Sequence, residues 1–117
     1  MSTVTTISTH VLDVSLGAPA ANITITLERI EGQGVATLIG GGVTNADGRV
    51  ASLASPSGEL SGGSYRLCFD VHAYFSATKR TSFYRTICID FQVADAPQHY
   101  HVPLLLSPFG YSTYRGS

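Results

Sequence analysis

The chain has 117 residues and a formal net charge of −1, and only 13% of its residues are charged. Its length is typical of one domain, so we expect a single domain over residues 1–117. Scattered Lys and Arg in a near-neutral chain give no electrostatic footprint for binding nucleic acid or an anionic membrane. The charged fraction is low against the roughly 25% of average soluble proteins, which favours association through a covered surface.

No targeting or membrane-spanning segment is visible in the sequence. The first residues lack the charged stretch and long apolar run of a secretory signal. No run approaches the roughly 18 apolar residues of a membrane span, so we expect a cytoplasmic protein without a membrane partner. Cys68 and Cys88 lie in apolar stretches without CxxC spacing. This favours free, buried thiols, although the sequence leaves a disulfide open.

Most of the chain alternates between apolar and polar residues with a period of two, as strands do. The pattern is clearest at Ile23, Ile25 and Leu27, whose polar neighbours indicate a half-buried strand. The predicted strands cover, in chain order, residues 4–13, 22–28, 36–43, 49–53, 64–70, 85–93, 99–106 and 111–115.

Turn residues separate these segments and indicate the fold class. Residues 17–19 and 45–48 carry turn signals, and residues 55–64, which contain Pro, Gly and Ser, predict a surface loop. Residues 71–80 have few β signals and are the one helical candidate. About eight short strands with one short helix predict an all-β fold, a two-sheet antiparallel sandwich.

The predicted strand at 99–106 has two unlike faces. One face is apolar and is expected to lie in the core: Tyr100, Val102, Leu104 and Leu106. The opposite face mixes two imidazoles with apolar residues: His99, His101, Pro103 and Leu105. A turn at 107–110 allows the last strand to form a hairpin with this one. We therefore expect a concave or intersubunit surface lined by His101, Leu105, Ser112 and Tyr114.

Histidines on strands are usually structural, but these have neighbours that point to chemistry. His10 lies near the end of the first strand beside apolar residues, and a neutral imidazole is a suitable base near pH 7. His99 and His101, at i and i+2 on one face, also suit a three-histidine zinc site with a third histidine from elsewhere. No carboxylate in this strand is placed to orient such ligands, so zinc stays an alternative.

Arg49 and the C-terminal residues complete the candidate set. Arg49 directly follows the turn at 45–48, and its planar guanidinium suits bidentate binding of an oxygen-rich anion or amide. The aromatic-rich last strand runs nearly to the end, so residues 114–117 are expected to be ordered. No GxSxG elbow is present to make a nucleophile of Ser117. Its hydroxyl and terminal carboxylate are expected to hydrogen-bond substrate or water.

Two long motifs near opposite ends of the chain resemble signatures of the transthyretin family. His-Val-Leu-Asp at 10–13 with Gly-Ala-Pro-Ala at 17–20 resembles the N-terminal signature, and residues 104–113 look like the C-terminal one. Segments 44–49, 58–60 and 63–66 follow in the expected order between them, so the resemblance covers nearly the whole chain.

Within that family, the chain resembles the hydroxyisourate hydrolases rather than the vertebrate hormone carriers. It has the hydrolase residues His10, Arg49 and His101, and it ends in Tyr-Arg-Gly-Ser at 114–117. The carriers have lysine, glutamate and threonine at the three matching positions and lack this ending.

The resemblance implies a transthyretin-like (prealbumin) sandwich and a homotetramer, a dimer of dimers, with active sites in a channel at the dimer–dimer interface. It implies an enzyme that hydrolyses an amide bond of 5-hydroxyisourate to give 2-oxo-4-hydroxy-4-carboxy-5-ureidoimidazoline, a step of urate (purine) breakdown. It implies no metal and no organic cofactor.

In the mechanism that we expect, His10 and His101 activate the attacking water, and either of them is the general base. Arg49 binds the substrate and stabilises negative charge at the attacked carbonyl. Ser117 assists catalysis by holding substrate or water, and Tyr114 and Ser112 line the substrate site.

Three alternatives remain from the sequence. A non-catalytic carrier of a small molecule, such as a thyroid hormone, would share the fold but show no turnover. A zinc hydrolase would use His10, His99 and His101. A purely structural module would leave the three basic residues without a role.

Overall fold

Strands dominate the computed structural model, which describes residues 4–53 and 60–117. The elements are β1 (Thr6–Asp13), β2 (Ala18–Pro19), β3 (Thr24–Ile30), a 3-10 turn (Gly32–Gly34), β4 (Ala36–Val43), β5 (Arg49–Val50), β6 (Gly63–Phe69), α1 (Val71–Ala77), β7 (Ile87–Val93), β8 (His99–Ser107) and β9 (Gly110–Thr113). Within these residues, no helix is long and apolar enough to cross a membrane.

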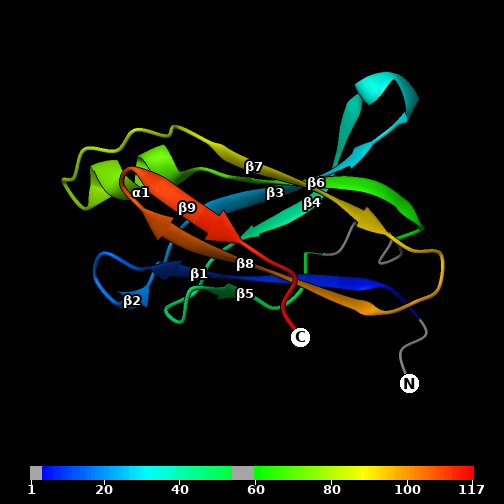
Figure 1. The fold of residues 1–117 in the computed structure, drawn as a ribbon, viewed down its shortest axis with the longest axis horizontal. Coiled ribbons are helices and arrows are strands. Elements are labelled where there is room, and N and C mark those ends of the chain that lie inside the picture. Colours follow the sequence, from blue (N-terminus) through cyan, green and yellow to red (C-terminus); the bar gives the residue numbers. More distant parts are fainter. Residues whose placement is uncertain (1–3, 54–59) are drawn as a thin grey trace.

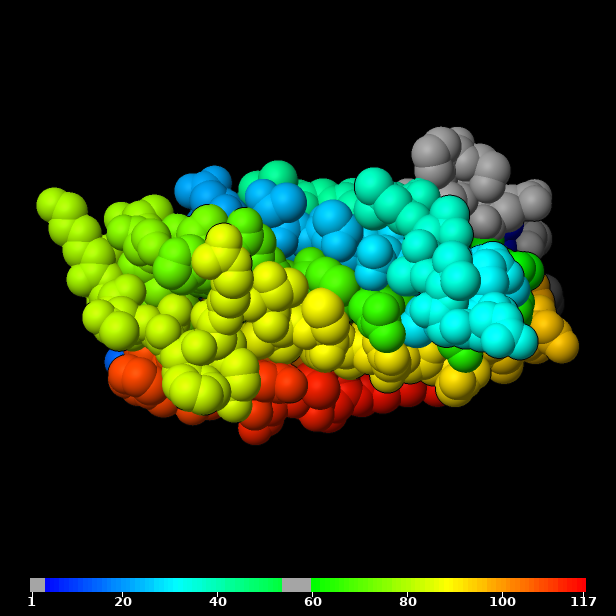
Figure 2. Space-filling view, turned by 90° about the horizontal axis from the view of Figure 1, so that it is seen from above, coloured from blue at the N-terminus to red at the C-terminus, as the bar shows by residue number. Residues whose placement is uncertain are grey.

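The strands form two sheets that pack on each other, which confirms the predicted sandwich (Figure 1). One sheet has the order β2-β1-β8-β9, with β5 also paired to β1, and the other has the order β4-β3-β6-β7. Figure 2 shows the outer face of the second sheet, with the C-terminal part of the chain along the edge beyond β7. The one departure from the predicted antiparallel pattern is that β1 and β8 pair in parallel. These two strands are not joined by a hairpin, so no tight turn dictates their direction.

The core lies between the sheets, where alternate residues of each strand face inward. Side chains with 0% exposure come from both sheets: Ile7, Val11, Leu104 and Leu106 from the first, and Ile25, Leu27, Leu67 and Phe69 from the second. The predicted inward face of residues 99–106 is confirmed, because Tyr100 and Val102 are also buried. Burying this face turns the opposite face of β8, with its histidines, outward.

Several predicted boundaries are too long. The helix ends at Ala77 rather than residue 80, because Lys79 adopts a left-handed φ of 59° that a helix cannot continue through. The predicted strand at 49–53 ends at Val50, although the N–H of Leu53 still donates to the carbonyl of Ile7 (2.9 Å). The strands predicted at 4–13, 85–93 and 111–115 are observed as β1, β7 and β9. Half of the predicted loop at 55–64, residues 55–59, lies outside the described residues.

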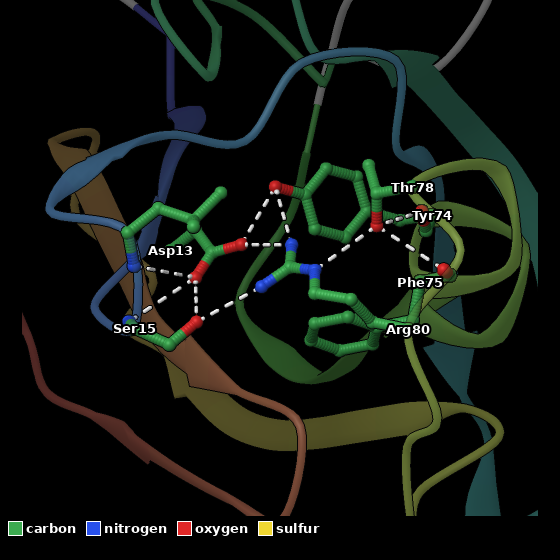
Figure 3. Close-up of polar contacts among 7 residues, drawn as sticks. Asp13, Ser15, Tyr74, Phe75, Thr78 and Arg80 are labelled. Atoms are coloured by element: carbon green, nitrogen blue, oxygen red, sulfur yellow. Dashed lines mark hydrogen bonds and ion pairs between the residues drawn. The ribbon is translucent and has the colours of Figure 1, made fainter.

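The buried carboxylate of Asp13 ties α1 and the segment after it to β1 (Figure 3). Its oxygens accept hydrogen bonds from Arg80 Nη2 (2.6 Å), the Tyr74 hydroxyl (2.7 Å) and the Ser15 hydroxyl (2.5 Å). Burial alone would raise the pKa of Asp13, but these hydrogen bonds and the charge of Arg80 outweigh it and lower the pKa to about 2. Asp13 is therefore ionised and fully paired.

Cys68 and Cys88 are free thiols, but the prediction that both are buried is wrong. They lie opposite each other on β6 and β7, with their sulfur atoms 2.8 Å apart, and Cys88 is exposed. The period of two explains this, since the neighbours of Cys68 in sequence, Leu67 and Phe69, fill the core instead. Partial burial, with added effects of Cys88 and Glu28, raises the pKa of Cys68 to about 12.

Candidate active site

The register of β1 with its two neighbours assembles a polar group on the outer face of the first sheet. On one side His10 pairs with Arg49 of β5, and on the other Ser8 pairs with His101 of β8. Residues in register point to the same face of a sheet. Three segments that are distant in sequence thus place their side chains together on this face.

A hollow of about 380 Å³ lies over these strands, which is in the range of roughly 300–1,000 Å³ for small-molecule sites. Arg49, His99, His101 and Ser117 contribute to its lining, so it brings together three of the four predicted catalytic residues. The fourth, His10, is partly exposed on β1 and lies beside the lining rather than in it.

The C-terminal segment folds back over His101. The backbone N–H of Gly116 donates to the carbonyl of His101 (2.8 Å), forming an isolated bridge beyond β9. A Cβ on Gly116 would lie 2.5 Å from Cδ2 of His101 and 3.3 Å from Cγ of Pro103. Only glycine fits so close to the ring, and this approach brings Ser117 into the hollow.

The turn before β5 positions Arg49. Oδ1 of Asn45 accepts hydrogen bonds from the backbone N–H groups of Asp47 (2.9 Å) and Arg49 (3.0 Å). Gly48, with φ of 75°, accepts a hydrogen bond from the N–H of Val11 (2.7 Å), which ties the turn to β1. Among the residues that the structure describes, Arg49 forms no salt bridge. Its charge is therefore available to a ligand in the hollow.

The ring of His101 is held through one of its two nitrogens. Its Nδ1 lies 2.8 Å from the hydroxyl of Ser8, and the same hydroxyl lies 2.9 Å from Nε2 of His99. Nδ1 of His99 in turn lies 2.6 Å from the hydroxyl of Thr6. Since Nδ1 of His101 is engaged, Nε2 is the ring nitrogen left for a bound molecule.

Ser8 and Thr6 were not among the residues expected from the sequence. The signal for them was the period of two, which places both on the face of His10. Small hydroxyl residues are common on strands, and only their pairing with His101 and His99 across the parallel register distinguishes them.

The surroundings of His101 favour its neutral form. Partial burial lowers its pKa from the ordinary 6.5, and the positive charge of Arg49 and the neighbouring His99 and His10 lower it further. A neutral imidazole with a lone pair on Nε2 can accept a proton from water at neutral pH. The hollow thus combines a base with an unpaired cation.

Tyr114 and Ser112 lie outside the lining of this hollow. Ser112 pairs with Leu105 and borders a shallow depression at the β8–β9 hairpin, with Val14 and Tyr111. Tyr114 is 57% exposed and borders a cavity between β7 and β9. Their part in substrate binding stays a prediction.

The alternative zinc site would need His10, His99 and His101 as ligands of one metal ion. Among the described residues, no three His, Cys, Asp or Glu side chains are grouped so as to hold a metal ion. Both ring nitrogens of His99 contact hydroxyl groups, and one nitrogen of His101 does so.

Known proteins resemble this chain over nearly its whole length. The model of the HIUase/Transthyretin family matches residues 7–116. A probable 5-hydroxyisourate hydrolase of Caenorhabditis elegans is 48% identical over 95% of this chain and 81% of its own length.

Solved structures agree with the sequence match. The 5-hydroxyisourate hydrolase of Klebsiella pneumoniae superposes with a TM-score of 0.83 at 41% identity, covering 97% of this chain and 100% of its own. Sea bream transthyretin in complex with thyroxine gives a TM-score of 0.86 at 31% identity, covering 94% and 93%. The chain belongs to the HIUase/Transthyretin family.

Proposed function

We propose that the protein is a hydrolase that opens the ring of 5-hydroxyisourate, with 2-oxo-4-hydroxy-4-carboxy-5-ureidoimidazoline as the product, in urate breakdown. The observation that carries this proposal is one hollow that joins a histidine favoured in its neutral form with an arginine without an ion pair. Hydrolase relatives that are 41% and 48% identical name the substrate class.

In the proposed reaction, Nε2 of His101 takes a proton from a water molecule as its oxygen attacks the ring carbonyl carbon. The carbonyl oxygen gains negative charge, which the guanidinium of Arg49 stabilises. The C–N bond then breaks, and the imidazolium returns its proton to the leaving nitrogen. This assigns the base role to His101, since its ring faces the hollow and its pKa is lowered.

His10, Ser117, Tyr114 and Ser112 have supporting roles in the proposal. His10 is opposite Arg49 in the β1–β5 register, so we propose that it binds the substrate or shares the proton transfer. The hydroxyl of Ser117 borders the hollow and is suited to hold the substrate or the attacking water. Tyr114 and Ser112 would close the site from the side of β9.

We propose a homotetramer, a dimer of dimers, with the hollow at the dimer–dimer interface. β7 and β9 are the last strands of their sheets and run side by side, with a cavity between them lined by Ile89, Phe91 and Tyr114 (Figures 1 and 2). Aromatic side chains near this edge are exposed, including Phe109 at 69% and Tyr111 at 42%. Adjacent edge strands with apolar side chains are suited to pair with another copy. Sedimentation velocity measures the assembly.

A non-catalytic carrier is the second candidate, because sea bream transthyretin, solved with thyroxine, has the same fold. Histidine and arginine side chains around the hollow favour the hydrolase over a site for an apolar aromatic ligand. Tight thyroxine binding by calorimetry, with no turnover of 5-hydroxyisourate, would support the carrier instead.

The experiment is to follow the ultraviolet decay of freshly generated 5-hydroxyisourate with and without the protein. We expect wild type to accelerate the decay, in EDTA as well, and His10→Ala, Arg49→Ala and His101→Ala to lose activity. His72→Ala is the matched control, because His72 is exposed on α1, away from the hollow. Decay at the uncatalysed rate with wild type, or the wild-type rate in all three site variants, would overturn the proposal.

A further inference from the structure

A single serine hydroxyl lies between two histidines in the lining of the hollow. Ser8 is 8% exposed, and its oxygen is 2.8 Å from Nδ1 of His101 and 2.9 Å from Nε2 of His99. The two imidazole rings are nearly parallel, with an interplanar angle of 17° and centroids 6.5 Å apart. The geometry makes Ser8 the shared hydrogen-bond partner of both rings.

The single proton of the Ser8 hydroxyl limits which tautomers the two imidazole rings can adopt. A serine hydroxyl has one proton to donate and can accept two hydrogen bonds. Ser8 can therefore donate to only one of the two facing nitrogens, and the other nitrogen must carry its own proton for both contacts to be hydrogen bonds. The tautomers of His99 and His101 are thus coupled through Ser8.

Two arrangements satisfy both contacts with neutral rings. In the first, Nδ1–H of His101 donates to Ser8, Ser8 donates to Nε2 of His99, and Nδ1–H of His99 donates to Thr6. In the second, every donor and acceptor is reversed, so His101 carries its proton on Nε2. Only the first leaves the lone pair on Nε2, the nitrogen that Ser8 does not engage and that can act as a base.

The charge of Arg49 selects the first arrangement. A neutral imidazole has the negative end of its dipole at the bare nitrogen, and Arg49 shares the hollow with His101. A nearby cation favours a bare ring nitrogen over an added N–H, and the charge of Arg49 acts on His101. Arg49 therefore favours the first of the two arrangements that Ser8 allows.

We propose that Ser8 and His99 are positioning residues that keep the proton of His101 on Nδ1 and its lone pair on Nε2. The hydroxyl of Ser8 donates a hydrogen bond to Nε2 of His99, and this leaves the oxygen of Ser8 to accept one from Nδ1–H of His101. The inference rests on the proposed function for its catalytic consequence, but the tautomer of His101 is a property of the free protein.

The test combines 15N chemical shifts of the His101 ring with the kinetics of 5-hydroxyisourate decay. We expect wild-type His101 to be protonated on Nδ1 in its neutral form. Ser8→Ala removes one oxygen atom from the strand and should shift the population toward the Nε2–H form. The same variant should lower kcat by roughly 10- to 100-fold with little change in KM. Loss of a hydrogen-bond partner of a metal-bound histidine has an effect of this size.

Three further variants separate positioning from folding. Ser8→Thr keeps the hydroxyl on a strand and should restore the tautomer and kcat. His99→Phe keeps a ring of similar shape but frees the hydroxyl of Ser8 to turn, so it should shift the tautomer in the direction of Ser8→Ala. Thr9→Val is the control, because Thr9 donates to the carbonyl of Val102 (2.6 Å) on the core face of the same strand.

An unchanged His101 tautomer in Ser8→Ala and His99→Phe would overturn the inference, whatever the activity. So would equal changes in Thr9→Val, since they would reflect a general disturbance of β1. A wild-type protein that does not accelerate 5-hydroxyisourate decay would refute the proposed function alone, because the 15N shifts still report the coupling.

Discussion

β1 carries ionisable side chains in two settings that are opposite in kind, although they lie close together on the strand. Asp13 faces inward with 0% exposure and is paired with Arg80, Tyr74 and Ser15 (Figure 3). His10 faces outward, opposite Arg49, which has no salt bridge in the described part of the chain. The fully paired carboxylate of Asp13 stabilises the fold, because removing a partner would leave a buried charge. The guanidinium of Arg49 has no ion-pair partner among the described residues and can therefore bind a substrate.

The largest expected effect is a loss of stability when the ion pair of Asp13 with Arg80 is removed. Arg80→Ala leaves Asp13 buried without its cation, and we expect a loss of about 3–5 kcal/mol in the free energy of unfolding. Urea denaturation measures the loss. Arg66→Ala is the matched control, since it breaks the exposed pair with Asp90 (2.7 Å) and should cost about 0–1 kcal/mol. Equal losses in the two variants would mean that the Asp13 pair has no special weight.

Acid should also reduce the stability that ionised Asp13 contributes, by a smaller amount. The pKa of Asp13 is lowered from 3.8 to about 2, so the folded state favours the ionised form. This stabilisation is present above the unfolded pKa and is lost as the pH falls from about 4 towards 2. At about 1.4 kcal/mol per pKa unit, it amounts to roughly 2.5 kcal/mol. We expect unfolding free energies measured between pH 6 and pH 2 to show this loss, and Asp13→Asn to lack that share of it.

Changes at the hollow should lower activity rather than stability. In Gly116→Ala the new Cβ would lie 2.5 Å from His101, so the ring or the C-terminal segment must move. We expect kcat/KM to fall by roughly 10- to 100-fold, because small displacements of catalytic groups are costly. The midpoint of urea denaturation should change little. Gly32→Ala serves as the control, since a Cβ there meets no atom within 4 Å. Wild-type activity in Gly116→Ala would show that the close approach is not needed.

The smallest effect is on the titration of His101. Burial and the charge of Arg49 lower its pKa, so the neutral base should persist below pH 6.5. The acid limb of kcat/KM should therefore have its midpoint below 6.5, with activity lost as the pH falls through it. Removing the charge in Arg49→Met should raise the pKa of His101, as measured by NMR. A lower pKa in Arg49→Met would contradict the electrostatic account.

Part of this comparison could be predicted from the sequence. The period of two placed His101 opposite the core residues Tyr100 and Val102, and the turn at 45–48 placed Arg49 at a strand start. Both inferences need only local geometry. The site residues His10, Arg49 and His101 came from the family resemblance, and the structure brings them to one face.

The rest depends on contacts that local pattern does not encode. The parallel register of β1 with β8 sets Ser8 level with His101, and strands so far apart in sequence can pair in several registers. The roles of Ser8, Thr6 and Gly116 depend on distances of about 3 Å or less between side chains or backbones that only the packed fold fixes. Likewise, period two alone does not show that the cysteine face of β6 and β7 is the outer one.

The outer face of β1 and its neighbouring strands, with His10, Arg49 and His101, carries the proposed chemistry. The most direct measurement is kcat/KM for 5-hydroxyisourate in His101→Asn against wild type, at neutral pH. We predict a fall of about 10²–10⁴-fold, the usual contribution of a general base, with an unchanged midpoint of urea denaturation. Wild-type kcat/KM in His101→Asn would contradict the account.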